Sequence, residues 1–259
     1  MLKSLYTPCM EHAEEVPRGT LGTVRNATLL LDLLSEGAPF QQLTELAERS
    51  DLSLPTVHRL LRSLAAAGLV EQDPVSLRYG LGPELVRLAE RYLARLPVFR
   101  AISPYLVELR NATRATVLAA VLVRGWTVYI DRVDGDDLGG IFREPARMRP
   151  AFDTAAGRLL SARSRDGEWD EALASTANGR RFSADDRKRW AEAPYLVLVE
   201  EPTDLAEIAA PVTAADGSAL ASLVVAGSAR RYSEELLVEE VAPQLARAAA
   251  AVSRSLSHG

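Results

Sequence analysis

The sequence is poor in the side chains on which most metal sites and hydrolase mechanisms depend. Among its 259 residues there is one cysteine, Cys9, and there are three histidines, His12, His58 and His258. A single cysteine cannot form an internal disulfide, and so few sulfur and imidazole ligands do not make an ordinary zinc or iron site. Two of the histidines lie in terminal segments, which leaves too little for a Ser-His-Asp or Cys-His arrangement. We therefore expect no metal and no catalytic residues of these kinds.

Phosphate loops, long apolar runs and an export signal are missing as well. The chain contains neither GxGxxG nor GxxxxGK[ST]. Its apolar runs are interrupted well before the roughly 20 residues that a membrane-spanning helix needs. The first 20 residues lack a long apolar segment and carry three glutamates. We expect no cofactor, no membrane association and a cytoplasmic location, and an enzyme based on carboxylate or lysine chemistry remains only an alternative.

The first third of the chain has three helical periods followed by a hairpin pattern. Spaced apolar residues predict a helix over residues 23–37, ended by Gly37, and a short helix over 43–50. A third helix is predicted from Leu54 to Leu69, with a side-chain cap from Ser53 and Pro55 in its first turn. The runs LVEQD and SLRYGL, joined by DPVS, then predict a β-hairpin. This order of elements is typical of a winged helix-turn-helix, whose third helix enters the DNA major groove.

The predicted third helix has two chemically different faces. Its apolar stripe consists of Val57, Leu60, Leu61 and Leu64. The candidate DNA-binding residues are Ser53, Pro55, Thr56, His58, Arg59, Arg62, Ser63 and, on the hairpin, Arg78. Arg59 can bond guanine O6 and N7 together, Thr56 a phosphate or a base edge, and Arg78 a phosphate.

A second interpretation of this face stays open, because exposed arginines are often only solvated. Between Leu21 and Gly82 there are five arginines and seven acidic residues, a net charge of −2, whereas nucleic-acid-binding domains usually have a basic excess. The third helix itself carries two arginines and no acid. The alternative function is a ligand sensor whose winged domain mediates protein contacts rather than DNA binding.

The rest of the chain mixes helix and strand patterns. A helix over PELVRLAERYLARL is followed by one expected to begin with Ser103 as cap and Pro104 at its first position. The predicted strands are TVLAAVLV and TVYIDRV around an Arg124-Gly125 turn, then YLVLVEE, LAEIAAPVTA and SALASLVVAG, the last two around Asp216-Gly217. Helices are predicted over AAGRLLSAR, over 166–174 and from Ser233 to Ser253. Hairpins mixed with helices indicate an α+β sensor domain.

These residues carry a family resemblance. The segment from about Thr20 to Leu88, with VRNATLLLDLL, LTELAERSDLSLPTVHRLLRSLAAAGLVE and YGLGPELVRLA, resembles the DNA-binding domain of IclR-type bacterial transcriptional regulators. MRPAFDTAAGRLLSA and IAAPVTAADGSALASLVVAG match the second half of that family.

The resemblance implies an α+β protein with four parts. These are a flexible arm (1–20), a winged helix-turn-helix domain (21–82), a linker helix (83–97) and a GAF-like α+β effector-binding domain (98–259). The implied function is a transcriptional regulator whose affinity for double-stranded operator DNA is controlled by a small-molecule effector. A homodimer or homotetramer is expected, since one short helix contacts too few base pairs and family members pair through the first and linker helices.

The resemblance also implies an effector site. Its residues are Arg149, Ala155, Ala156, Leu205, Glu207, Val224 and Ala226. Val224 and Ala226 stand where carboxylate-binding members have hydroxyl side chains, and Glu207 stands where a cysteine is common. A charged pair between Arg149 and Glu207 is expected. The apolar wall favours a larger, aromatic effector over glyoxylate or pyruvate. Val224 and Ala226 can equally be core residues.

The segment IFREPARMRP admits two interpretations. Arg143, Arg147 and Arg149, near Glu144, either clamp an anionic ligand or form a solvated loop.

Overall fold

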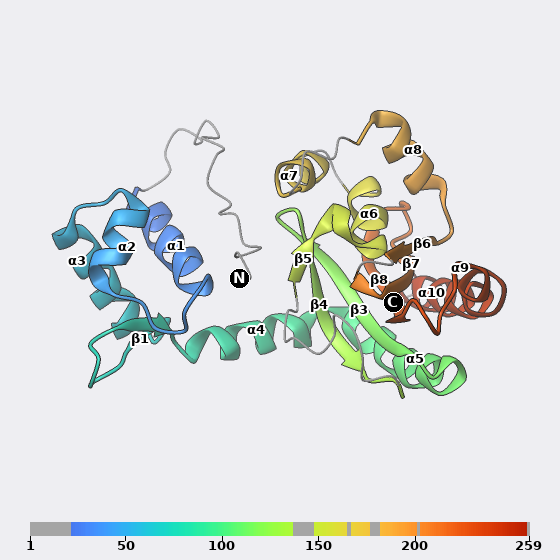
Figure 1. The fold of residues 1–259 in the computed structure, drawn as a ribbon, viewed down its shortest axis with the longest axis horizontal. Helices are drawn as coiled ribbons and strands as arrows, with labels where there is room; N and C mark the ends of the chain where they lie inside the picture. Colours follow the sequence, from blue (N-terminus) through green and yellow to red (C-terminus); the bar gives the residue numbers. More distant parts are fainter. Residues whose placement is uncertain (1–21, 137–147, 165–166, 177–181, 201–202, 258–259) are drawn as a thin grey trace. The chain divides into compact units, whose positions relative to one another are not determined.

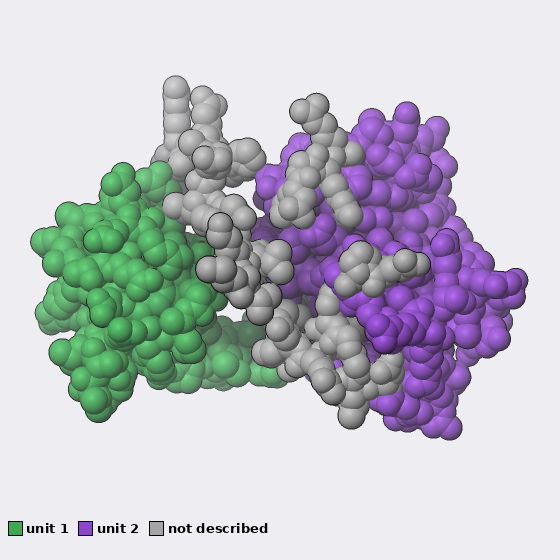
Figure 2. Space-filling model, in the orientation of Figure 1, with its two compact units in different colours: residues 1–95 green, residues 96–259 purple. Residues whose placement is uncertain are grey.

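The computed structural model describes residues 22–136, 148–164, 167–176, 182–200 and 203–257 (Figure 1). The chain divides into two compact units, residues 1–95 and 96–259 (Figure 2). The arm expected over residues 1–20 lies outside the described residues, as do Arg143, Glu144 and Arg147. Within the described part, no helix combines the length and the apolar character needed to cross a bilayer.

The first unit consists of four helices and a short hairpin among its described residues. The elements are α1 (Gly22–Ser35), α2 (Leu43–Ser50), α3 (Leu54–Ala66), β1 (Val70–Gln72), β2 (Tyr79–Leu81) and α4 (Glu84–Arg95). β1 and β2 pair antiparallel, as the sequence predicted. Leu30, Leu46 and Leu61 are fully buried where α1, α2 and α3 meet. The periodic leucines thus form the core that fixes the orientation of α3.

Both ends of α3 differ in detail from the prediction. The helix ends at Ala66 rather than Leu69, because Gly68 adopts a left-handed φ of 72° and turns the chain into the hairpin. Leu69 lies between α3 and β1, and its carbonyl accepts a hydrogen bond from Gly82 N at 2.8 Å. At the start, the predicted side-chain cap is wrong: the Ser53 hydroxyl bonds the Thr56 hydroxyl at 2.8 Å and caps no amide.

A buried amide ties the end of α1 to the hairpin. Gln41, only 2% exposed, donates from Nε2 to the carbonyls of Leu33 at 2.9 Å and Glu36 at 2.7 Å. Its Oε1 accepts from Arg49 Nη1 at 2.7 Å, and its backbone pairs with Tyr79 of β2. These bonds satisfy orphan carbonyls of α1 and hold the hairpin against the three helices.

The second unit is built around a six-stranded antiparallel sheet of order β5-β4-β3-β8-β7-β6. The strands are β3 (Thr116–Val123), β4 (Trp126–Val133), β5 (Met148–Pro150), β6 (Leu196–Glu200), β7 (Leu205–Thr213) and β8 (Ala219–Ser228). The helices are α5 (Pro97–Thr113), α6 (Ala155–Ala162), α7 (Glu168–Ala174), α8 (Ala184–Glu192), α9 (Glu234–Leu236) and α10 (Ala242–Ser257), with a π-helical segment at Leu237–Val241. The predicted Arg124-Gly125 turn is confirmed, with both residues at positive φ.

The prediction for the start of α5 is wrong. Ser103 and Pro104 lie inside this helix, which begins at Pro97 after Leu96. The buried residues Val98, Ile102 and Leu106 continue one apolar stripe across the proline. Burial of this stripe against the sheet outweighs the cost of a proline within a helix.

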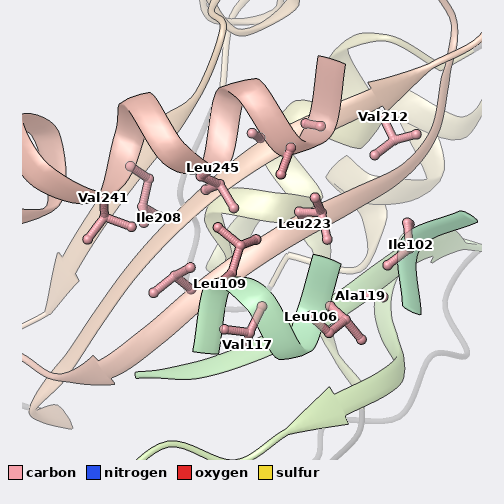
Figure 3. Packing of buried hydrophobic residues seen from close by; sticks show 14 of the residues in the cluster. Ile102, Leu106, Leu109, Val117, Ala119, Ile208, Val212, Leu223, Val241 and Leu245 are labelled. Carbon is pink, nitrogen blue, oxygen red and sulfur yellow. The ribbon is translucent and has the colours of Figure 1, made fainter. Parts of the chain in front are cut away.

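Helices cover both faces of the sheet (Figure 1). α5 and α10 pack on one face through a large apolar core that includes Leu106, Ile208, Leu223 and Leu245 (Figure 3). α6 packs on the other face, against alternate residues of the same strands. Because side chains alternate across a strand, Ile208 enters the first core while Glu207 faces α6.

Candidate functional site

The exposed face of α3 carries most of the residues predicted to bind DNA. His58, Arg59, Arg62 and Ser63 are all exposed, while the apolar stripe of the helix is buried. Among the described residues, neither Arg59 nor Arg62 forms an ion pair. Two guanidinium groups are therefore presented to solvent from successive turns of a helix that its own core holds in place.

The remaining predicted residues lie at the start of α3 and on the hairpin. Ser53 and Pro55 are exposed, and Thr56 is half-buried and bonded to Ser53. Ser63 donates its hydroxyl to the Arg59 carbonyl at 3.0 Å, which leaves it as an acceptor toward a partner. Arg78 is exposed just before β2.

The hairpin turn has its own electrostatic organisation. Asp73 accepts hydrogen bonds from Ser76 N at 2.8 Å and from the Ser76 hydroxyl. These two bonds hold the pKa of the Asp73 carboxyl below its ordinary value. The acid closest to Arg78 in the sequence therefore accepts hydrogen bonds within its own turn.

A buried carboxylate meets the start of α6 on the other unit. Glu207 of β7 is 0% exposed, and its Oε1 accepts a hydrogen bond from Ala156 N at 3.1 Å. The first amides of a helix lack intrahelical acceptors and carry partial positive charge. Glu207 thus occupies the position at which helix N-termini bind anions.

Two threonine side chains and a glycine fix this helix start. Thr154 caps α6 by accepting from Gly157 N at 2.9 Å, and its hydroxyl bonds that of Thr127 on β4 at 2.7 Å. Both threonines are fully buried. A Cβ on Gly157 would collide with the Ala151 carbonyl and the Thr127 hydroxyl, so only glycine permits this approach.

Further polar atoms are buried beside Glu207 without satisfied hydrogen bonds. Tyr129 Oη, Arg149 Nη1 and Glu207 Oε2 are each inaccessible to solvent, and none forms a hydrogen bond of acceptable geometry with a described residue. Such buried groups are uncommon in native proteins and need a partner. These three atoms lie close together because Tyr129 of β4 and Arg149 of β5 are on the same face of the sheet as Thr127.

An ion pair across this face shows that the sheet is strongly curled. Arg149 Nη2 lies 3.9 Å from Glu200 Oε2, although β5 and β6 are the two edge strands. Strands spaced about 4.8 Å apart would put the edges of a flat six-stranded sheet about 24 Å apart, beyond the reach of two side chains. The sheet is therefore a half-barrel whose inner face holds the polar cluster of Tyr129, Arg149, Glu200 and Glu207.

Burial controls the ionisation of this cluster. It raises the pKa of the Glu207 carboxyl above its ordinary value of 4.5, although the charge of Arg149 and the amides of Ala156 and Ala155 oppose the rise. Burial and the neighbouring charge of Glu207 also raise the pKa of the Tyr129 hydroxyl. The tyrosine therefore stays a neutral donor and acceptor.

The residues predicted for an effector site lie on this inner face. Ala155, Ala156, Val224 and Ala226 share one apolar cluster with Tyr129, and Leu205 is buried on β7 two residues before Glu207. The predicted ion pair between Arg149 and Glu207 is wrong, because Arg149 pairs with Glu200 instead. The positive charge of Arg149 still acts on Glu207 and opposes the rise of its pKa.

Sequence reasoning missed Tyr129 and Glu200. The alternation of TVYIDRV would have placed Tyr129 on the face of Thr127, but no local pattern brings together two opposite edge strands. Among the described residues, no group of three His, Cys, Asp or Glu side chains is placed to hold a metal ion.

A family model and a characterised relative both match this chain to the same family of transcriptional regulators. The IclR helix-turn-helix domain model matches residues 23–74. The transcriptional regulator KdgR of Escherichia coli K12 is 30% identical over 211 residues, which cover 77% of this chain and 80% of that protein.

Solved structures share the fold over nearly the whole chain. The IclR transcriptional regulator of Alicyclobacillus acidocaldarius has a TM-score of 0.71 at 25% identity, covering 91% of this chain and 98% of that one. An IclR homologue of Microbacterium hydrocarbonoxydans, crystallised with 4-hydroxybenzoate, has a TM-score of 0.67 at 18% identity, covering 90% and 98%.

Proposed function

Because this chain belongs to the IclR family of DNA-binding transcriptional regulators, we propose that α3 contacts operator bases and that the inner face of the half-barrel binds a small effector. The observation that carries the first part is the exposed basic face of α3, with Arg59 and Arg62 in no ion pair with a described residue. We propose a regulator without catalytic activity, working in the cytoplasm.

In this proposal the residues of α3 have separate tasks. Arg59 bonds a guanine through O6 and N7, and Arg62 and His58 contact neighbouring base edges or phosphates. Ser53, Pro55, Thr56 and Ser63 flank them, and Arg78 on the hairpin contacts the DNA backbone.

The effector site consists of Arg149, Ala155, Ala156, Leu205, Glu207, Val224 and Ala226, to which we add Tyr129 and Glu200. The three buried polar atoms without good hydrogen bonds support this assignment, since a ligand can supply their partners. Val224 and Ala226 form an apolar wall beside them. A relative of the same fold was crystallised with 4-hydroxybenzoate, which agrees with a small organic effector.

We further propose that the protein is a homodimer or homotetramer. No residue of α4 is buried, although its apolar side chains include Val86 at 66%, Leu88 at 46% and Tyr92 at 62% exposure. Apolar residues exposed in this number on one helix favour a protein contact. A second copy would cover them and present two recognition helices to a two-fold operator.

DNA binding is tested by fluorescence anisotropy on the DNA upstream of the gene, with excess competitor DNA and at two salt concentrations. We expect Arg59→Ala to weaken specific binding by about 1–3 kcal/mol if it makes a bidentate base contact. Arg230→Ala is the matched control, because that side chain is 90% exposed in the other unit.

The outcome separates the proposal from the protein-contact alternative. Specific binding that Arg59→Ala weakens and Arg230→Ala leaves intact supports contact between α3 and bases. Unchanged affinity of Arg59→Ala removes this residue from the proposed site. Absence of binding at low salt on fragments spanning the neighbouring promoters favours a winged domain that contacts protein, which is the interpretation suggested by its net acidic charge.

The effector site is tested with compounds that raise the thermal stability of the wild-type protein. We expect Arg149→Ala to lose at least about tenfold in compound affinity while it keeps DNA binding without compound. Circular dichroism of the variant checks its folding. A variant that is folded and responds like wild type would place the effector elsewhere.

A further inference from the structure

The start of α6 already has an anion. The Glu207 carboxylate reaches it from β7, is fully buried, and accepts from Ala156 N at 3.1 Å. The next amide, Gly157 N, is bonded to Thr154 at 2.9 Å, and Arg158 N is bonded to the Thr154 carbonyl at 3.2 Å. The helix terminus therefore has its donors engaged by the protein itself.

The second oxygen of this carboxylate is available to a ligand. Glu207 Oε2 is buried and forms no hydrogen bond of good geometry with a described residue, and the Tyr129 hydroxyl is the neighbouring group that interacts with this carboxyl. Tyr129 Oη and Arg149 Nη1 are in the same condition, and apolar residues such as Leu118 and Val224 pack around them. The cluster offers an acceptor, a hydroxyl and a cationic donor beside an apolar wall.

The charges of the cluster disfavour an anionic ligand at this point. Two carboxylates, Glu200 and Glu207, lie with Arg149 on the inner face of the half-barrel, and the charge of Arg158 also acts on Glu207, although less than that of Arg149. A ligand carboxylate placed at the start of α6 would meet Glu207 at close range in a buried environment, where like charges repel strongly. A hydroxyl or another uncharged donor would instead complete the coordination of Glu207 Oε2.

We propose that Glu207 is the specificity-determining residue of the effector site: its carboxylate fills the anion position at the start of α6. This position therefore rejects carboxylate and phosphate groups, and the effector places an uncharged hydrogen-bond donor, such as a hydroxyl, against Glu207. This inference rests on the proposed effector site and names its ligand class.

Acetate is the probe, because it has the carboxylate that Glu207→Ala removes. We expect Glu207→Ala to bind acetate at least about tenfold more tightly than wild type, since the vacated helix terminus regains an anion. Binding is measured by calorimetry and by thermal unfolding, with chloride at the same ionic strength as the reference.

Two variants control for charge and for folding. Glu207→Gln keeps the space filled and should bind acetate no better than wild type. Glu108→Ala removes the same charge from an exposed position on α5 and should also gain nothing. If Glu207→Ala unfolds, recovery of its circular dichroism by acetate and not by chloride reports the same event, and Glu207→Ser provides a second vacated site.

Two outcomes would overturn the inference. Wild type that binds acetate as well as Glu207→Ala would show that Glu207 excludes nothing. If neither Glu207→Ala nor Glu207→Ser responds to acetate, the start of α6 does not bind anions. Calorimetry and thermal unfolding are both made without DNA. Failure of the proposed regulatory function would instead appear as a missing effector response in operator binding, so the two failures are distinguishable.

Discussion

Glu207 is the residue whose environment departs most from that of an ordinary glutamate. It is fully buried on β7, where its carboxylate is bonded to the start of α6 and influenced by Arg149. Burial disfavours the charged form, and this effect exceeds the help from the helix and the arginine. Glu207 therefore lies in the proposed effector site at the expense of the free energy of unfolding.

The pH dependence of stability should reveal this cost. Because the pKa of Glu207 is higher in the folded than in the unfolded state, its favourable contribution is full below its ordinary value of 4.5 and is lost as pH rises through the folded value. The free energy of unfolding of Glu207→Gln minus that of wild type should thus increase from pH 4 to pH 8. The rise is about 1.4 kcal/mol for each unit between the two pKa values.

Urea unfolding at several pH values measures this difference. Glu108→Gln, an exposed substitution on α5, is the control, and its difference from wild type should stay nearly constant with pH. A Glu207→Gln difference that falls as pH rises would mean that hydrogen bonds from α6 dominate and that the folded pKa is lowered.

Among the secondary-structure elements, α6 depends most on one close approach. Its first turn lies against β4 through the Thr154–Thr127 hydroxyl pair, and Gly157 leaves no room for a side chain. The same approach brings Ala156 N to Glu207. The packing of α6 therefore positions both the carboxylate and the apolar wall.

Gly157→Ala should destabilise the second unit. The added methyl collides with backbone and with a buried hydroxyl, so we expect a loss of about 1–3 kcal/mol, typical of overpacked cores. Gly22→Ala is the matched control, because no atom lies within 4 Å of an added Cβ there. Chemical unfolding of both variants checks this, and a stability of Gly157→Ala equal to wild type would mean that α6 shifts without cost.

At the scale of the whole molecule, the feature that bears on assembly is the exposed apolar surface of α4. α4 has no buried residue, yet Val86, Leu88 and Tyr92 are each more than two fifths exposed. Burying such residues in a second copy removes apolar surface from water. Assembly and operator affinity are therefore expected to change together.

Leu88→Glu should shift the protein toward the monomer and weaken operator binding by at least about tenfold, because a buried unpaired charge is costly. Sedimentation velocity at several concentrations measures the first effect, and anisotropy the second. Glu90→Ala, an exposed polar substitution on α4, should change neither. A Leu88→Glu variant with unaltered sedimentation would exclude this face of α4 from the interface.

The sequence by itself determined the local elements and the kind of protein. The leucine period of α1 to α3, the hairpin after Gly68 and the alternating strands of the second half depend on short-range patterns of burial and turn chemistry. The exposed arginines of α3 were equally predictable, because the helix period fixes which residues face away from a core. The sequence patterns did not predict α8 or the short strand β5. They also placed the start of α5 at Pro104, whereas the packing of Val98 and Ile102 extends this helix back to Pro97.

Only the tertiary structure decided the composition of the inner site. Whether Arg149 meets Glu200 or Glu207 depends on the curl of a sheet whose edge strands are joined by no local pattern. Whether Glu207 is a ligand-facing acid or the anion of α6 depends on the approach that Gly157 permits. Such long-range geometry results from the summed twist of six strands and the packing of helices on both faces, which no window of sequence contains.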